Sequence, residues 1–427
     1  MNESTPSEQP ERVDEAATAP VDPPTVPSAD PATSLSDVDD EPEPAGDEPA
    51  PPTADAATAS PAHLVEEPER APGQAQADVP EPERTGPGLS FGFNMGKIAG
   101  HGEDSDPILR DGRELGLVAV FDGMGGAGGT VYDTPDGPRT GAYLASRVAR
   151  DVVEQRMVAL LDPEWNLDGP ATAQDLHRSV REALQARLTE LKAPASGLRS
   201  RLLRALPTTM ALVALQRREA GGDRWVGHAF WAGDSRAYVF DPGAGAQQLT
   251  VDDIKDRGDA MANLREDSVV SNAMSADVDF VVHHRRVELT APFLVVAGTD
   301  GCFGYLPSPM HFEHLVLAAL RDAPDTETWS GAVQTATSAV TGDDAAMSVL
   351  GVGADHEQFR TLFAARTAEL EQRWITPLDA LDKDVQRRER ELQDLRTAQR
   401  QQQAQSWAAY KPDYERYIAT ADGRGAP

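Results

Sequence analysis

Three short acidic turns, far apart in the sequence, carry the side chains best suited to chemistry. They are Phe121-Asp122-Gly123-Met124-Gly125-Gly126, Gly298-Thr299-Asp300-Gly301 and Thr341-Gly342-Asp343-Asp344. Each lies beside a short apolar run that predicts a buried strand. A carboxylate at the edge of a hydrophobic sheet is costly to desolvate unless positive charge meets it. Several such carboxylates converging on one place are best explained by divalent cations.

The elements that must position these turns alternate between strand-like and helix-like patterns from Leu89 to about Gly353. We expect strands over Leu115–Phe121, Thr208–Leu215, Trp225–Ala232, Ala237–Phe240, Phe280–Leu289, Phe293–Ala297 and Ala345–Val352. We expect helices over Arg139–Leu161, Gln174–Leu191, His311–Arg321 and Thr328–Val340. Strands outnumber helices and often follow one another directly. This order predicts an α+β fold, a central β-sandwich of two mainly antiparallel sheets flanked by α-helices.

Residues 1–86 have a composition that cannot bury a core. They hold 17 of the 33 prolines, and 21 acidic residues against three arginines. Few aromatics and a high charge of one sign are typical of a disordered chain. We therefore expect a disordered, acidic, Pro-rich tail over 1–86, a folded domain over 87–354 and a helical extension over 355–427.

The extension shows apolar residues at spacings of three, four and seven. They are Leu370, Trp374, Leu378, Leu381, Val385, Leu392 and Leu395, separated by Arg, Glu, Asp and Gln. This spacing predicts an amphipathic helix with a coiled-coil-like seam, broken near Pro377 and ending before Pro412. Such a stripe must cover something: its own folded domain, a second copy of the chain, or another protein bound through 355–411.

Composition also excludes several classes of protein. The chain is acidic beyond its tail and shows no stripe of Lys and Arg with interleaved aromatics, which argues against nucleic-acid binding. Cys302 is the one cysteine, so there is no intramolecular disulfide, as suits a reducing compartment. No run reaches the roughly 18 apolar residues of a membrane span. We expect a soluble, cytoplasmic protein without a membrane partner.

The motifs then match a known family in their order. They are Asp122-Gly123-Met124-Gly125-Gly126, Thr208-Thr209, Ala232-Gly233-Asp234-Ser235-Arg236-Ala237-Tyr238, Leu249-Thr250, Thr299-Asp300-Gly301 and Asp343-Asp344. Over roughly Phe91 to Gly353 the sequence resembles the metal-dependent protein phosphatases of type 2C, in a bacterial style. No single motif is decisive, but their occurrence together in the family's order is a strong signal.

The resemblance implies hydrolysis of phosphoserine or phosphothreonine in proteins by water held between two Mg²⁺ or Mn²⁺ ions. Asp122 would bridge the ions, the carbonyl of Gly123 would join one shell, and Asp300 and Asp343 would complete the other, so the three aspartates carry catalysis. Asp234 resembles a residue that helps to hold a third, weaker ion. Hard oxygen ligands suit both metals independently of the family.

The opening motif departs from the family pattern. His101-Gly102-Glu103-Asp104 supplies the two acids, so Glu103 and Asp104 are expected to serve the second ion. The Arg that grips the substrate phosphate in the family falls near Ala99, which cannot bind phosphate. Lys97 or His101 would have to take its place, although Lys lacks the bidentate fork of Arg. For both, a solvated loop residue is the alternative.

The simpler interpretation of each motif remains beside the functional one. An isolated Asp-Gly is most often a turn. Before the last strand, Asp343-Asp344 stands where the family usually has Asp-Asn. Strand alternation favours Asp343 as a metal ligand, with Asp344 at the neighbouring polar position. Which of the two aspartates is the ligand stays open. Asp252-Asp253 is expected to be an exposed helix start in the variable flap, and His283-His284 a solvated strand surface. Cys302 is expected to be an inert core residue.

Two insertions shape access to the site: a loop between Gly129 and Arg139, which could roof the cleft, and the polar segment between Asp252 and Asp279, expected to form the flap.

The sequence therefore predicts a metal-dependent serine/threonine phosphatase whose partner is a phosphorylated protein, opposing a serine/threonine kinase. One alternative is a degenerate relative of the same fold that binds phosphoproteins without catalysis. Another is an interaction scaffold whose tail and C-terminal helix do the work.

Overall fold

The computed structural model describes residues 89–417, except residues 99, 161–166, 192–203, 256–257 and 265–268. The chain divides into two units, Met1–Gln76 and Ala77–Pro427, and every described residue lies in the second. The predicted tail over 1–86 therefore lies outside the described residues.

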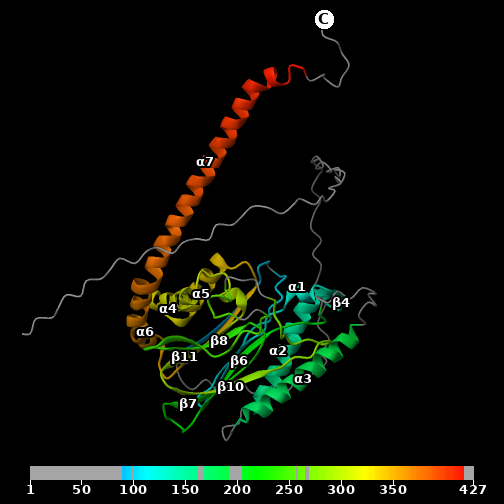
Figure 1. Cartoon of the computed structure of the whole chain (residues 1–427). Helices are drawn as coiled ribbons and strands as arrows, with labels where there is room; N and C mark the ends of the chain where they lie inside the picture. Colours follow the sequence, from blue (N-terminus) through cyan, green and yellow to red (C-terminus); the bar gives the residue numbers. More distant parts are fainter. Residues whose placement is uncertain are drawn as a thin grey trace, which may run out of the picture. The chain divides into compact units, whose positions relative to one another are not determined.

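Two five-stranded sheets build the centre of this unit (Figure 1). One has the strand order β1-β12-β11-β8-β9 and the other β10-β7-β6-β3-β2, and every neighbouring pair is antiparallel. A separate hairpin is formed by β4 and β5. The strands are β1 Leu89–Met95, β2 Ile108–Asp111, β3 Leu115–Val120, β4 Val131–Thr134, β5 Gly137–Thr140, β6 Met210–Arg217, β7 Arg224–Ala232, β8 Arg236–Asp241, β9 Gly245–Gln248, β10 His283–Thr290, β11 Phe293–Gly298 and β12 Ala345–Val352.

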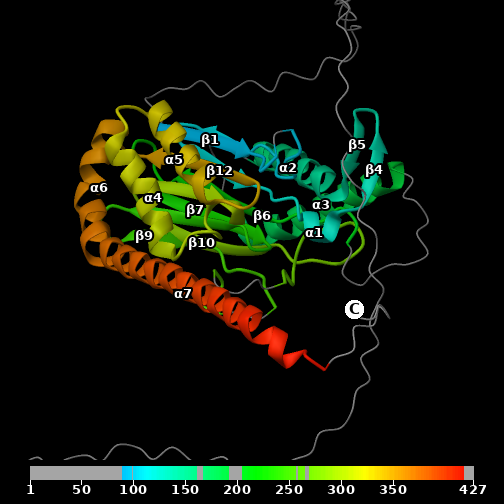
Figure 2. The same cartoon turned by 90° about the horizontal axis from the view of Figure 1, so that it is seen from above.

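Helices cover the outer face of each sheet (Figure 2). Side chains of α2 and α3 share a hydrophobic cluster with β3, β6 and β7, and those of α4, α5 and α6 share another with β1, β11 and β12. The helices are α1 Gly125–Gly128, α2 Gly141–Leu160, α3 Gly169–Glu190, α4 Pro309–Asp322, α5 Thr326–Val340, α6 His356–Leu370 and α7 Thr376–Tyr414, with a 3-10 turn η1 Asp300–Cys302 and a π turn η2 Glu371–Ile375.

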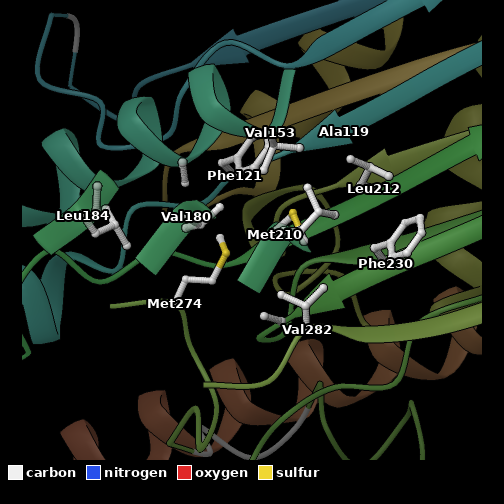
Figure 3. Close-up of a cluster of buried hydrophobic side chains, with 14 of the residues drawn as sticks. Ala119, Phe121, Val153, Val180, Leu184, Met210, Leu212, Phe230, Met274 and Val282 are labelled. Atoms are coloured by element: carbon white, nitrogen blue, oxygen red, sulfur yellow. The ribbon is translucent and has the colours of Figure 1, made fainter. Parts of the chain in front are cut away.

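Strand β3 shows why its sequence reads as a continuous apolar run. Successive side chains of a strand point to opposite faces. Leu117 and Ala119, with Phe121 directly after the strand, face the helices, whereas Val118 and Val120 join the cluster between the two sheets. Figure 3 shows Ala119 and Phe121 beside Val153 and Val180. Both faces of β3 are therefore buried, which leaves polar residues only at its ends.

Helix α6 belongs to the core, whereas α7 does not. Phe359 and Phe363 of α6 are buried in the cluster that covers the first sheet. A capping box between Asp355 and Gln358 fixes the start of α6. No residue of α7 is buried, and Leu395 of the predicted seam is 68% exposed. Among the described residues, the first two of the seam, Leu370 and Trp374, pack on the same core cluster, whereas the seam residues of α7 are exposed.

The predicted fold class is confirmed: two antiparallel sheets form a sandwich with flanking helices and a long C-terminal helix. The predicted helix break occurs as η2, and Pro377 opens α7, where it has no backbone hydrogen bond to lose. The expected end before Pro412 is wrong, because α7 continues to Tyr414 and includes Pro412 in its last turn. A proline removes one backbone bond, which a helix tolerates more easily near its end. The insertion after Gly129 is a hairpin, β4–β5, and not an irregular loop.

Across the described ranges, no helix has the length and apolar character that crossing a bilayer requires.

Because α6 is packed and α7 is exposed, matched truncations on the two helices should differ sharply. Phe363→Ala is expected to lower the free energy of unfolding by about 3–5 kcal/mol, the range for deleting a buried aromatic ring. Leu395→Ala is expected to change it by less than about 0.5 kcal/mol. Urea unfolding of both variants measures the difference, and equal losses would contradict the assignment of α6 to the core.

Candidate metal centre

Five aspartates from five separate segments meet at one end of the sandwich. Asp122 follows β3 and Asp300 follows β11, while Asp104, Asp234 and Asp343 precede β2, β8 and β12. The pKa of the Asp122 carboxyl is raised well above its usual range, first by burial and then by the negative charges of the other four. Residues far apart in the sequence therefore share one electrostatic environment.

Asp122 and Asp300 form the centre of this group. The pKa of Asp300 is raised to about 6 by burial and by the charge of Asp343, and its carboxyl is hydrogen-bonded to that of Asp122. A hydrogen bond between two carboxyl groups needs a proton on one of them. The backbone carbonyl of Asp122 is fixed as well, because it accepts from the hydroxyl of Thr208 at 2.5 Å and from the N–H of Thr209 at 2.9 Å.

Asp104 is the most deeply buried of these acids, with 1% of its surface exposed. Its Oδ1 accepts from the N–H of Gly123 at 3.3 Å and its Oδ2 from the hydroxyl of Thr299 at 2.9 Å. The same Thr299 hydroxyl accepts from the N–H of Ala346 at 2.9 Å. Burial, followed by the charge of Asp300, raises the pKa of Asp104 to about 8. Asp104 thus links the ends of β3, β11 and β12.

Asp234 lies in a tight turn between β7 and β8. Gly233 has a φ of +104°, and a Cβ there would lie 2.6 Å from the side chain of Thr209, so only glycine fits. Burial, and then the charge of Asp300, raise the pKa of Asp234 to about 7. The neighbouring guanidinium of Arg236 is bound to Asp252, and its charge offsets only part of the rise in the Asp234 pKa.

Glu103, the residue before Asp104, is close enough to Asp343 and Asp344 for their charges to raise its pKa. Its Oε1 accepts from the hydroxyl of Thr140 at 2.5 Å. A Cβ at Gly125 would lie 2.0 Å from the Glu103 Oε2, so the glycine-rich turn makes room for this carboxylate. A Cβ at Gly123 would lie 2.5 Å from the Glu103 carbonyl oxygen. The pKa of Glu103 is raised by burial, which the Thr140 hydrogen bond partly offsets.

Asp343 and Asp344 have different surroundings. Both oxygens of Asp344 accept backbone hydrogen bonds, Oδ1 from Lys97 N–H at 2.7 Å and Oδ2 from Glu103 N–H at 2.5 Å. Asp343 is exposed, its Oδ1 accepts from the N–H of Asp344, and its charge raises the pKa of Asp300. A Cβ at Gly301 would lie 1.8 Å from the Asp344 carbonyl oxygen, so the two acidic turns touch. Asp344 therefore fixes the backbone at Lys97 and Glu103, whereas Asp343 adds negative charge next to Asp300.

The expected phosphate-binding residues lie at the rim. Lys97 and His101 are both exposed, and the structure gives neither side chain a hydrogen bond or ion pair among the described residues. Ala99, the position where the family carries Arg, lies outside the described residues.

Sequence reasoning missed Arg147, which fixes the acidic loop. Its guanidinium donates to the carbonyl oxygens of Glu103 and Asp104 at 3.2 and 3.0 Å and lies 3.5 Å from the centre of the Tyr143 ring. Burial lowers its pKa from the usual range. Its helical spacing from Tyr143 was the available signal, but its targets lie some forty residues earlier in the sequence.

The expectation that Asp252-Asp253 is an exposed helix start is wrong. Both side chains are 4% exposed. Asp252 binds Arg236 with two hydrogen bonds of 2.9 and 2.6 Å. Asp253 accepts from the N–H of Gly233 at 3.2 Å and from Asn272 at 2.6 Å. The pair therefore ties the flap to the Asp234 turn, which requires burial.

The remaining candidates contribute nothing to the acidic group. His283 and His284 point to opposite sides of β10: His283 lies 3.1 Å from Asp253, and His284 lies 3.0 Å from His228. The expectation that these two histidines form a solvated strand surface is therefore only partly correct, because both residues are partly buried. Cys302 is buried, and burial raises the pKa of its thiol, so it lacks the thiolate of a nucleophile.

A divalent cation fits the chemistry of this donor set. As they stand, no three or more His, Cys, Asp or Glu side chains of the described residues are arranged to hold a metal ion. The carboxylates nevertheless offer the hard oxygen atoms that Mg²⁺ and Mn²⁺ prefer. Their pKa values are raised first by burial and then by the negative charges of neighbouring carboxylates. A bound cation would neutralise that negative charge.

No protein-family model matches the chain, and no curated protein matches its sequence. Among solved structures, a bacterial serine phosphatase is 15% identical with a TM-score of 0.46, over 62% of this chain and 98% of that one. The Mycobacterium tuberculosis serine/threonine phosphatase PstP/Ppp is 18% identical with a TM-score of 0.41 and the same coverage. The catalytic domain of PstP in complex with two manganese ions is 17% identical with a TM-score of 0.40, over 61% and 96%. Over 62% of its length, the chain is similar in structure to bacterial serine/threonine phosphatases.

Proposed function

We propose that this protein hydrolyses phosphoserine and phosphothreonine in other proteins, with Mg²⁺ or Mn²⁺ as its cofactor. The observation that carries the proposal is the convergence of five aspartates, in which the charges of Asp104, Asp234, Asp300 and Asp343 all raise the pKa of Asp122. These residues lie in the motifs that resemble the type 2C phosphatases, and in the same order. A buried group of this kind persists when it has a function that offsets its cost.

The residues divide into ligands and supports. Asp122, the Gly123 carbonyl, Asp300 and Asp343 would hold two ions, with Glu103 and Asp104 serving one of them directly or through water. Asp234 would help to hold a third, weaker ion. When bound, the ions supply an activated water and neutralise the charge that develops on the phosphoryl oxygens. Asp344 positions the Glu103 backbone, and Arg147 holds the carbonyl oxygens of the same loop.

The substrate in this proposal is a protein phosphorylated by a serine/threonine kinase, in the cytoplasm. The hydrogen-bonded flap behind Asp252 and Asp253 and the hairpin β4–β5 are the two elements near the acidic group on which recognition of that substrate would depend.

A second candidate is a relative that binds phosphoproteins without turning them over. The observation in its favour is the arrangement of the described acidic side chains, which forms no ready metal site. Manganese-stimulated release of phosphate from a phosphothreonine peptide separates the two, because a binding module would bind the peptide and release none.

Removing a central carboxylate should abolish metal-dependent turnover. Asp122→Asn and Asp300→Asn are expected to lower hydrolysis of p-nitrophenyl phosphate by roughly a hundredfold or more, because each loses a charged metal ligand. The fold should survive, since the amide is the same size and less costly to bury. Asp151→Asn, on an exposed carboxylate of α2, is the matched control. Full activity in either central variant, with normal circular dichroism, would refute the assignment.

Substitutions of Asp343 and Asp344 should affect different properties, Mn²⁺ binding for Asp343 and folding stability for Asp344. Asp344→Ala removes the acceptor for two backbone N–H groups and is expected to cost about 1–3 kcal/mol of folding stability in the metal-free protein. Asp343→Ala is expected to leave that stability nearly unchanged and to weaken Mn²⁺ binding. Thermal melts with a Mn²⁺ titration measure both quantities, and the reverse pattern would make Asp344 the ligand.

The stability of the metal-free protein should fall as pH rises. Asp104, Asp234 and Asp300 have pKa values raised to about 8, 7 and 6, above the unfolded values, so the folded protein holds extra protons below those values and loses that stabilisation above them. Mn²⁺ takes the place of the protons. The increase in Tm on adding Mn²⁺ should therefore be larger at about pH 8 than at about pH 5. A metal-induced shift that is the same at both pH values would contradict this.

A further inference from the structure

We propose that Arg139, at the end of the inserted hairpin β4–β5, binds the phosphate group of the substrate. The inference rests on the proposed function, because it assigns a residue of the same site to substrate recognition. It gives the hairpin a defined role, binding of the substrate phosphate, where the sequence suggested only that this insertion could cover the cleft.

The hairpin is held at the acidic end of the sandwich. It lies between α1 and α2 in the sequence and beside α1 in both views (Figure 1, Figure 2). Tyr132, which pairs with Arg139 across the hairpin, is buried in the core cluster of α2 and α3. The N–H of Gly141 donates to the carbonyl of Thr130 at 2.8 Å and closes the base of the hairpin. Arg139 therefore stands on an anchored strand.

The residue after Arg139 connects the hairpin directly to the acidic group. Thr140 donates its hydroxyl to Glu103 Oε1 at 2.5 Å, and the Thr140 hydroxyl oxygen accepts from the N–H of Tyr143 at 3.2 Å. Thr140 thus joins the end of β5, the first turn of α2 and the Glu103 carboxylate. Arg139 is one residue away from this junction.

The ring of Tyr143 places two guanidinium groups together. Arg139 lies 4.5 Å from the ring centre and Arg147 lies 3.5 Å from it. The Arg147 guanidinium donates hydrogen bonds to the carbonyl oxygens of residues 102–104 and of Tyr143. Within the described residues, Arg139 makes no hydrogen bond and no ion pair, and it is only partly exposed. Its side chain is therefore oriented by an aromatic ring while its donors remain available.

A phosphate monoester has the chemistry to use those donors. It is a dianion, and carboxylates line the place where it must approach, so positive charge is required on its outer side as well as from the metal. Guanidinium matches phosphate oxygens with two parallel hydrogen bonds, which an ammonium cannot do. Lys97, the other cation at this rim, has an exposed side chain, and only its backbone is fixed by Asp344. Arg139 is the better oriented of the two.

The test compares Arg139→Gln, Arg139→Lys, Lys97→Gln and a control, Arg113→Gln, in the full chain. Arg113 is exposed in the turn between β2 and β3. Calorimetry measures binding of inorganic phosphate in the presence of Mn²⁺, and a separate titration measures Mn²⁺ alone. Hydrolysis of a phosphothreonine peptide gives kcat and KM.

Arg139→Gln is expected to weaken phosphate binding and raise KM by about tenfold to a hundredfold, the usual loss for a charge-assisted bidentate contact. Affinity for Mn²⁺ and kcat should change less than about threefold, which a merely structural role would not allow. Arg139→Lys should fall between Gln and wild type.

Three results would overturn the inference: wild-type protein with Mn²⁺ that binds no phosphate, an Arg139→Gln variant that binds it like Arg113→Gln, or a loss found in Lys97→Gln instead. Phosphate binding through Arg139 without any turnover by the wild type would support the inference and contradict the proposed catalytic function, so the two failures are distinguishable.

Discussion

Mutual repulsion among buried carboxylates is the constraint on which the rest of this structure depends. Burial raises the pKa of Asp104, Asp122, Asp234 and Asp300, and the charge of Asp300 adds to the shift of the other three. Folding alone gains nothing from such a group, because unpaired buried charge opposes the compact state. Protons relieve the repulsion in the metal-free protein, and divalent cations are the alternative means of relief. The proposed metal site therefore depends on contacts from the surrounding fold that hold these carboxylates in place.

The two sheets provide that stabilisation by meeting at one end. Asp122 comes from the sheet that contains β3, whereas Asp300 and Asp343 come from the sheet that contains β11 and β12. Hydrogen bonds from Asp104 and Thr299 connect the ends of these strands, and close contacts at Gly123 and Gly301 leave no room for a side chain. The supporting bonds join backbone N–H groups and carbonyl oxygens of one segment to side chains of another. Their rigidity keeps acids together that would otherwise separate.

The sequence alone predicted the acidic turns, the strands before or after them and the sandwich. These features are local: an apolar run next to Asp-Gly is visible within ten residues. It could not predict that Asp344 holds the backbone of Lys97 and Glu103, because those partners lie more than 240 residues away in the sequence. The burial of Asp252 also depends on a partner outside its own segment, because Arg236 at the start of β8 neutralises its charge. The hairpin β4–β5 is not evident from the sequence, because each strand has four residues and β5 contains a glycine and a proline.

The most direct measurement of the central claim is calorimetric titration of Mn²⁺ into the metal-free protein near neutral pH, repeated in two buffers with different enthalpies of ionisation. If cations replace protons on the buried carboxylates, binding heats will differ between the buffers and give a net release of protons. Binding with no proton release, or no binding heat in either buffer, would contradict the account.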